Sequence, residues 1–140
     1  MLIAGMEASL PAVKLRHVQT LWDAENLLSP VVCVGTVHNL EPQASNERLT
    51  WRIGATFLSQ MGGTGVLLGM CYMSSPLTRL VKLGQREGCH VIFGSMVLVR
   101  VVTAQATLWM KREIDAGVVD TTLRLVEQLI PCAAEPSSKL

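Results

Sequence analysis

The clearest hydrophobic pattern in the chain runs from Cys89 to Ile130 and predicts two kinds of element. Residues 96–102 are apolar and β-branched on both faces, which is typical of a strand inside a sheet. Over 104–113 apolar and polar positions alternate, as they do in a half-buried strand. Apolar positions then return at helical spacing over 118–130, with Asp115 as a plausible N-cap. We therefore expect a sheet covered by a closing amphipathic helix.

The preceding part of the chain carries further strand-like and helix-like stretches. In order they are a helix over 11–26, strands over 31–37, 48–58 and 66–73, and a helix that starts at Ser75–Pro76 and stops at Gly88. The glycine-rich turn at 62–65 joins the second and third strands as a hairpin. Short turns between consecutive strands favour antiparallel pairing. The predicted fold class is α+β, with an antiparallel sheet of about five strands in the order α-β-β-β-α-β-β-α.

Length and charge limit the classes of protein to consider. A length of 140 residues is typical of one domain. We expect a leader over 1–9, a single α+β domain over 10–132 and a polar C-terminal tail over 133–140. The net charge is +1 and the basic residues are scattered, so we expect no nucleic-acid partner. Because no run of about 18 apolar residues occurs, we expect no membrane partner and a cytoplasmic location.

Residue spacing gives no support to a metal site or to covalent catalysis. The four cysteines are far apart with no C-x-x-C pair, and the three histidines lack metal-ligand spacing, so no metal and no cofactor are expected. Cys89 and His90 are adjacent in a predicted strand, where neighbouring side chains point to opposite faces. The glycines at 62–65 lack the Lys-Ser/Thr ending of a phosphate-binding loop, so a hairpin turn is favoured. We predict no catalytic residues.

The order of elements and two short segments resemble a known family. Glu87-Gly-Cys-His90 closes the middle helix, and Gly94-Ser-Met-Val-Leu-Val99 follows it. With the closing strand and helix, this arrangement resembles type III secretion chaperones of the Tir-chaperone kind, and the YbjN-like domains that share their fold. The resemblance implies a homodimer that holds an extended segment of a partner protein without catalysing a reaction.

We therefore expect a protein-binding module in which Leu15, Val18, Trp22 and Trp51 contact the partner. An alternative is a roadblock-like or profilin-like regulatory scaffold, which uses a similar mix of elements. A third interpretation is a small peroxisomal enzyme, because the chain ends in Ser138-Lys-Leu140, the tripeptide that the peroxisomal import receptor binds.

Overall fold

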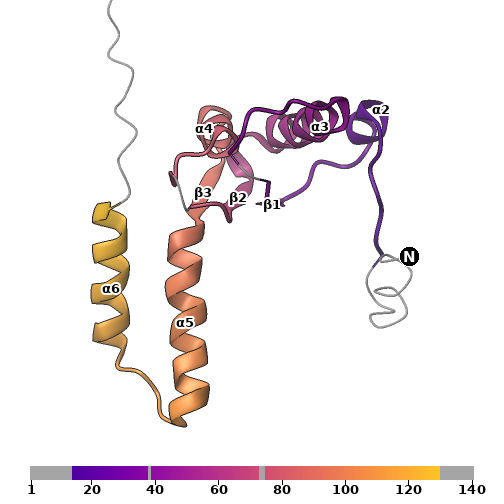
Figure 1. Ribbon diagram of the computed structural model, residues 1–140. Helices are drawn as coiled ribbons and strands as arrows, with labels where there is room; N and C mark the ends of the chain where they lie inside the picture. The colour runs from indigo at the N-terminus through magenta and orange to yellow at the C-terminus, as the bar shows by residue number, and fades with distance from the viewer. Residues whose placement is uncertain (1–13, 38, 73–74, 130–140) are drawn as a thin grey trace, which may run out of the picture.

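The computed structural model describes residues 14–37, 39–72 and 75–129. Helices and strands are both present, as predicted (Figure 1). In chain order the elements are α2 (Leu21–Glu25), β1 (Val32–Gly35), α3 (Ser45–Met61), the 3-10 turn η1 (Gly62–Thr64), β2 (Val66–Gly69), α4 (Arg79–Arg86), β3 (His90–Phe93), α5 (Gly94–Met110) and α6 (Ala116–Leu129).

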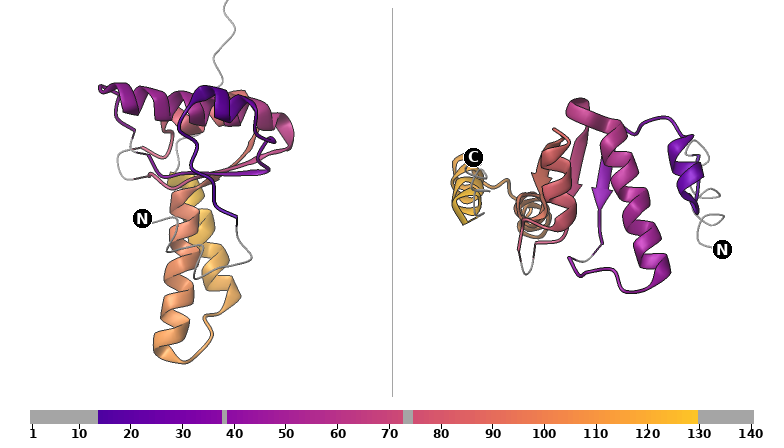
Figure 2. Two further views of the ribbon diagram at one scale, coloured as in Figure 1. Left: turned by 90° about the vertical axis from the view of Figure 1, so that its right-hand side faces the viewer. Right: turned by 90° about the horizontal axis from the view of Figure 1, so that it is seen from above.

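The described strands form one parallel sheet in the order β1-β2-β3. Val32 pairs with Val66, and Val66 in turn pairs with His90, so the three strands are in register along their whole length. Helices α3 and α4 are the crossovers that parallel pairing requires, and both lie on the same face of the sheet (Figure 2). The prediction of an antiparallel sheet of about five strands is therefore wrong.

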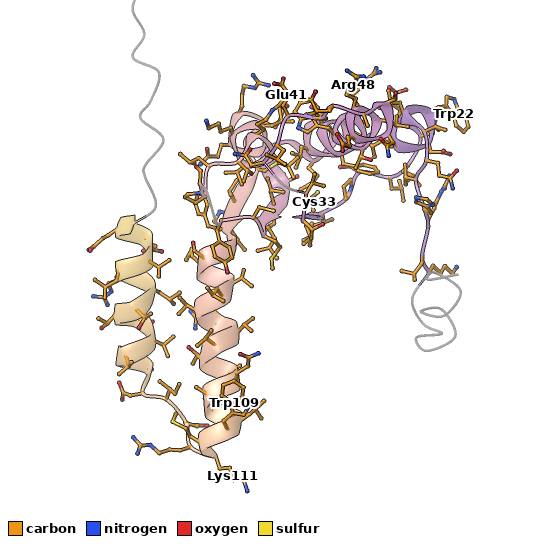
Figure 3. All side chains as sticks on the ribbon, viewed as in Figure 1. Trp22, Cys33, Glu41, Arg48, Trp109 and Lys111 are labelled. Carbon is orange, nitrogen blue, oxygen red and sulfur yellow. The ribbon has the colours of Figure 1, made fainter. Side chains whose placement is uncertain are left out.

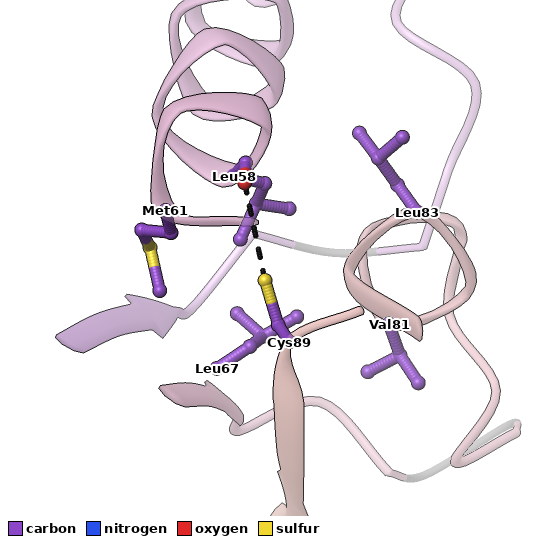
Figure 4. Packing of buried hydrophobic residues seen from close by; sticks show 6 residues of the cluster. All are labelled: Leu58, Met61, Leu67, Val81, Leu83 and Cys89. Carbon is purple, nitrogen blue, oxygen red and sulfur yellow. Dashed lines mark hydrogen bonds between the residues drawn. The ribbon is translucent and has the colours of Figure 1, made fainter. Parts of the chain in front are cut away.

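The hydrophobic core lies between this helical layer and the sheet. Its buried members are Leu58, Met61, Leu67, Val81, Leu83 and Cys89 (Figure 4). The thiol of Cys89 lies 3.9 Å from the carbonyl oxygen of Leu58, close to the point where α3 ends. Glycines allow this close packing, because a Cβ at Gly84 would lie 2.6 Å from a methyl carbon of Leu67. The core therefore joins α3, α4 and β2 into one unit.

The stretch 48–58 is part of helix α3 and not the predicted strand. Its apolar residues alternate, but Trp51, Ala55 and Leu58 also follow helical spacing, and all three contact the core. The start of the helix adds a local signal for the helical period. The carboxylate of Glu47 accepts hydrogen bonds from the N–H groups of the N-cap residue Ala44 (3.1 Å), as in a capping box, and of Gln43 just before it (2.8 Å).

The two strands predicted over 96–113 are wrong as well, because this stretch forms helix α5 and the turn after it. The less exposed residues Met96, Val99, Thr103 and Ala106 recur every three or four positions, as on one face of a helix. The Thr103 hydroxyl donates to the Val99 carbonyl at 2.7 Å, which offsets part of the cost of a β-branched residue in a helix. Helices α5 and α6 pack against each other as a hairpin.

Other sequence predictions agree with the structure in position. Strands β1 and β2 lie within the predicted ranges 31–37 and 66–73, and α6 lies where the closing helix was expected. The N–H of Gly117 donates to the Asp115 carboxylate at 2.8 Å. The middle helix starts later than predicted, with Thr78 as its N-cap. Over the described part of the predicted first helix, 14–26, the helix is shorter: α2 spans Leu21–Glu25, and 14–19 is not helical.

Several predicted features lie outside the described residues. These are the leader over 1–9, the start of the predicted first helix at 11–13, and the polar tail over 133–140 with its terminal tripeptide. The prediction of a single domain over 10–132 extends beyond the described range at both ends.

The second face of the sheet is largely uncovered by the described elements. Apolar side chains on this face come from every strand: Val32, Val34, Val66, Leu68 and Ile92. The hairpin of α5 and α6 leaves the sheet on this side but projects away from it (Figure 1). Val32 and Val34 in particular are 57% and 54% exposed. This exposure is unusual, because parallel sheets are normally buried on both faces.

Alanine substitutions of two adjacent leucines in β2 test whether only one face of the sheet is buried. Leu67 is fully buried beneath the helices, whereas Leu68 is half-buried on the opposite face. We expect Leu67→Ala to lower the free energy of unfolding by about 2–5 kcal/mol, and Leu68→Ala by about half of that or less. Urea unfolding followed by circular dichroism measures both. Equal losses would show that both faces are covered in the folded protein.

The start of α3 should be sensitive to pH. Hydrogen bonds from the backbone of Ala44 and Gln43 lower the pKa of Glu47. A lowered pKa in the folded state means that the stabilisation is present above the unfolded pKa of about 4.3 and is lost as pH falls through the folded value. Wild type should therefore be more stable than Glu47→Gln at pH 7, and the difference should shrink on acidification. A difference that is constant from pH 7 to pH 3 would contradict this assignment.

Candidate functional site

The free edge of β1 is a row of backbone groups that the described residues leave without a strand partner. The N–H of Val66 donates to the carbonyl of Val31, and the N–H of Met70 to that of Gly35, each at 2.9 Å. Backbone groups of successive strand residues point to opposite sides in the plane of the sheet. The N–H and C=O groups of Val32 and Val34 therefore point outward, away from β2.

The surface around this edge is apolar and uncharged. No charged residue occurs between Glu25 and Glu41. Leu28 is 95% exposed and Val31 is 73% exposed. A groove of about 410 Å³ borders the edge and is lined by Leu27, Leu28, Pro30, Val32, Cys33, Val34 and Phe57. The outward backbone groups of β1 thus lie beside a surface suited to apolar side chains.

Local packing sets where β1 ends. A Cβ on Gly35 would collide with a methyl group of Leu80, so a larger residue there would require this leucine side chain to shift. After Gly35 the chain turns across the carboxyl end of the sheet. The Asn39 side-chain carbonyl there accepts a hydrogen bond from the N–H of Arg79 at 2.8 Å. This contact joins the loop after β1 to the start of α4.

A second hollow lies at this carboxyl end of β1. It has a volume of about 210 Å³, and its walls come from the end of β1, the following loop, α3 and the first turn of α4. A neighbouring hollow of about 560 Å³ shares Val37, Leu40, Thr50 and Trp51 with it. Open parallel sheets bind ligands outside the carboxyl ends of their strands where the strand order reverses, and the order β1-β2-β3 has no reversal. The case for a small-molecule site here therefore depends on the residues that line the hollow.

Trp51 and Arg79 give this hollow its chemical character. The Arg79 guanidinium lies 5.4 Å from the centre of the Trp51 ring and 4.0 Å from a carboxylate oxygen of Glu41. The indole Nε1 of Trp51 is buried and has no hydrogen-bond acceptor among the described residues. A buried donor without an acceptor costs free energy, which a ligand oxygen could offset.

The thiols near the sheet are suited to packing rather than to nucleophilic chemistry. Burial raises the pKa of Cys33, and the nearby Cys89 raises it further. Burial also raises the pKa of Cys89, with a smaller contribution from Glu87. Because the thiolate is the reactive form, both side chains are weak nucleophiles at neutral pH. Within the described ranges no group of three or more His, Cys, Asp or Glu side chains could hold a metal ion.

The four residues predicted to contact a partner do not form one surface. Leu15 and Val18 are half-buried in the non-helical segment before α2. Trp22 is 68% exposed at the outer end of the helical layer (Figure 3). Trp51 lies in α3, where it lines the two hollows at the carboxyl end of β1 and a third groove that it shares with Leu21 of α2.

Sequence reasoning missed Val32 and Val34 as candidate contact residues. The available signal was the fifteen-residue stretch 26–40, which combines a valine-rich strand with a complete lack of charged residues. Edge strands commonly carry a charge or a proline that prevents further pairing. The strand residues of β1 carry neither.

None of the described helices is both long enough and apolar enough to cross a membrane. Comparison with protein-family models, with curated proteins and with solved structures finds no match for this chain.

Proposed function

We propose that this protein is a protein-binding module that adds an extended segment of its partner to the free edge of β1. The observation that carries the proposal is the outward-pointing backbone of Val32 and Val34 beside an apolar groove. In strand addition, main-chain hydrogen bonds supply affinity and pockets for alternate side chains supply specificity. The outward N–H and C=O groups of Val32 and Val34 support the first feature, and the apolar groove beside β1 supports the second.

The exposed surface of β1 also favours a binding role over a purely structural one. A contiguous apolar surface around an unprotected strand edge is costly for a monomer, because it promotes association with other chains. The partner segment would cover the valine side chains and satisfy the outward N–H and C=O groups together. The proposed role needs no catalytic residue and no cofactor, and the raised pKa values of Cys33 and Cys89 are compatible with it.

The chaperone resemblance enters this proposal only through the mode of binding. The antiparallel sheet that it implied is not the sheet observed. A secretion partner, a homodimer and the contacts of Leu15, Val18 and Trp22 stay predictions.

Replacing Val34 by proline tests strand addition directly. Its N–H points away from β2, so proline removes an outward donor without breaking the existing ladder. A fluorescent peptide with the sequence of residues 29–37, carrying serine in place of cysteine, serves as the probe in anisotropy titrations. We expect Val34→Pro to weaken binding by about tenfold or more.

Val34→Thr is the matched control, because threonine keeps both the β-branch and the N–H. This variant should bind within about threefold of wild type. Thermal melts of both variants establish that they are folded. Equal affinities for the proline and threonine variants, or no binding of the peptide at all, would contradict strand addition at this edge.

A second candidate function is favoured by the unpaired Trp51 Nε1 and the adjacent Arg79. A small ligand that combines a planar ring with an anionic group would stack on the indole, accept its N–H and pair with the guanidinium.

AMP is a suitable probe for this hollow because it carries both a ring and a phosphate. In a Trp22→Phe, Trp109→Phe background, AMP should quench the fluorescence of Trp51. Arg79→Gln should weaken the apparent affinity by about tenfold, whereas Arg48→Gln, an exposed arginine of α3 outside both hollows, should not change it. Equal effects of the two arginines, or no quenching at millimolar AMP, would exclude this candidate.

A further inference from the structure

We propose that the hollow at the carboxyl end of β1 binds a free α-amino acid with an apolar side chain. This inference rests on the second candidate function, because it names the ligand class for the same hollow. Its basis is the placement of one cationic and two anionic side chains around a common apolar wall. The ligand carboxylate would pair with Arg79 and its ammonium group with Glu41, while its side chain packs against Trp51.

The two adjacent hollows differ in charge. Among the described residues, Arg79 is the only charged side chain that lines the smaller hollow, and Glu41 and Glu47 are the only charged side chains that line the larger one. The hollows share four residues: Val37, Leu40, Thr50 and Trp51. A ligand beside these shared residues therefore has a cation on one side and carboxylates on the other.

The pair formed by Arg79 and Glu41 is open to a ligand. A guanidinium nitrogen of Arg79 lies 4.0 Å from a carboxylate oxygen of Glu41, which is too far for a hydrogen bond. The two side chains are 43% and 79% exposed, so water screens their attraction. The ammonium and carboxylate groups of an α-amino acid are attached to one carbon atom. They can therefore bind neighbouring side chains of opposite charge together, each through charge-assisted hydrogen bonds.

The second carboxylate of the larger hollow favours a ligand that is not a simple anion. Hydrogen bonds from the backbone of Ala44 and Gln43 lower the pKa of Glu47, so this side chain is ionised at neutral pH. Both bonds end on Oε2, and neither uses the lone pairs of Oε1. An anion at Arg79 would be repelled by Glu41 and Glu47, whereas an ammonium group on the same ligand would be attracted by them.

The wall that the two hollows share favours an apolar side chain on the ligand. Val37 and Leu40 are 58% and 79% exposed, so a ligand can cover apolar surface that now faces water. The Arg79 guanidinium lies 5.4 Å from the centre of the Trp51 ring, so a carboxylate bound to it is held close to the indole. An aromatic side chain such as that of phenylalanine would pack against these residues.

Three ligands with the same phenyl ring test the charge requirement. L-phenylalanine carries both charged groups, 3-phenylpropionate lacks the ammonium group, and 2-phenylethylamine lacks the carboxylate. Binding is measured by the fluorescence of Trp51 in the Trp22→Phe, Trp109→Phe background, with excitation at a wavelength that the phenyl ring does not absorb. L-phenylalanine should bind about tenfold or more tightly than either of the other two ligands.

Glu41→Gln should affect the two carboxylate ligands differently. The substitution removes the partner of the ammonium group, so the affinity for L-phenylalanine should fall by about tenfold. It also removes a competitor for Arg79, so the affinity for 3-phenylpropionate should not fall. Glu113→Gln, which changes an exposed carboxylate in the turn between α5 and α6, is the matched control and should alter neither affinity.

An affinity for 3-phenylpropionate that equals or exceeds the affinity for L-phenylalanine would overturn this inference. A Glu41→Gln variant that binds L-phenylalanine as tightly as wild type would do the same. If AMP or 3-phenylpropionate binds through Arg79 while L-phenylalanine does not, the hollow stands as a site for a ring with an anionic group, and only the ligand class is wrong. If none of these ligands changes the fluorescence of Trp51, the second candidate function fails together with this inference.

Discussion

The direction in which the strands follow one another determines the rest of this structure. Each step from β1 to β2 and from β2 to β3 moves the same way across the sheet. Parallel strands need a crossover, and right-handed crossovers that move in one direction all fall on one face. Both α3 and α4 therefore cover the same side, where Leu58, Leu67 and Val81 are fully buried. The other side of the sheet and the outer edge of β1 stay open within the described residues.

The sequence predicted the strands that are short and flanked by turn residues, but not the long helices. In α3 the apolar residues satisfy both a period of two and helical spacing, and Trp51, Ala55 and Leu58 pack in the core at helical spacing. In α5 the many valine residues have a high β propensity, which favours a strand. The element has seventeen residues, however, which is longer than an ordinary strand. In both stretches tertiary packing as a helix overrides the local sequence preference for a strand.

The misassigned α3 explains the error in the sheet. When 48–58 is taken as a strand, the glycines at 62–65 become a hairpin turn and antiparallel pairing follows. In the structure these glycines form η1 and the short connection between α3 and β2. Candidate binding residues depended on the same assignment. Trp51 lines a hollow only because it lies on a helix beside the end of β1, and Val32 is exposed only because the sheet is covered on one side.

The two candidate sites share residues of β1, because Cys33 and Val34 line both the hollow and the groove beside the edge. Strand addition would place a new backbone next to Val34, one residue before the glycine that ends β1 at the hollow. Val34 itself lines both the hollow and the groove beside the edge. The hydrogen bond from the N–H of Arg79 to Asn39 joins the loop after β1 to the start of α4. A ligand in the hollow and a strand at the edge would then alter each other's affinity by the same factor, because coupling between two binding equilibria is reciprocal.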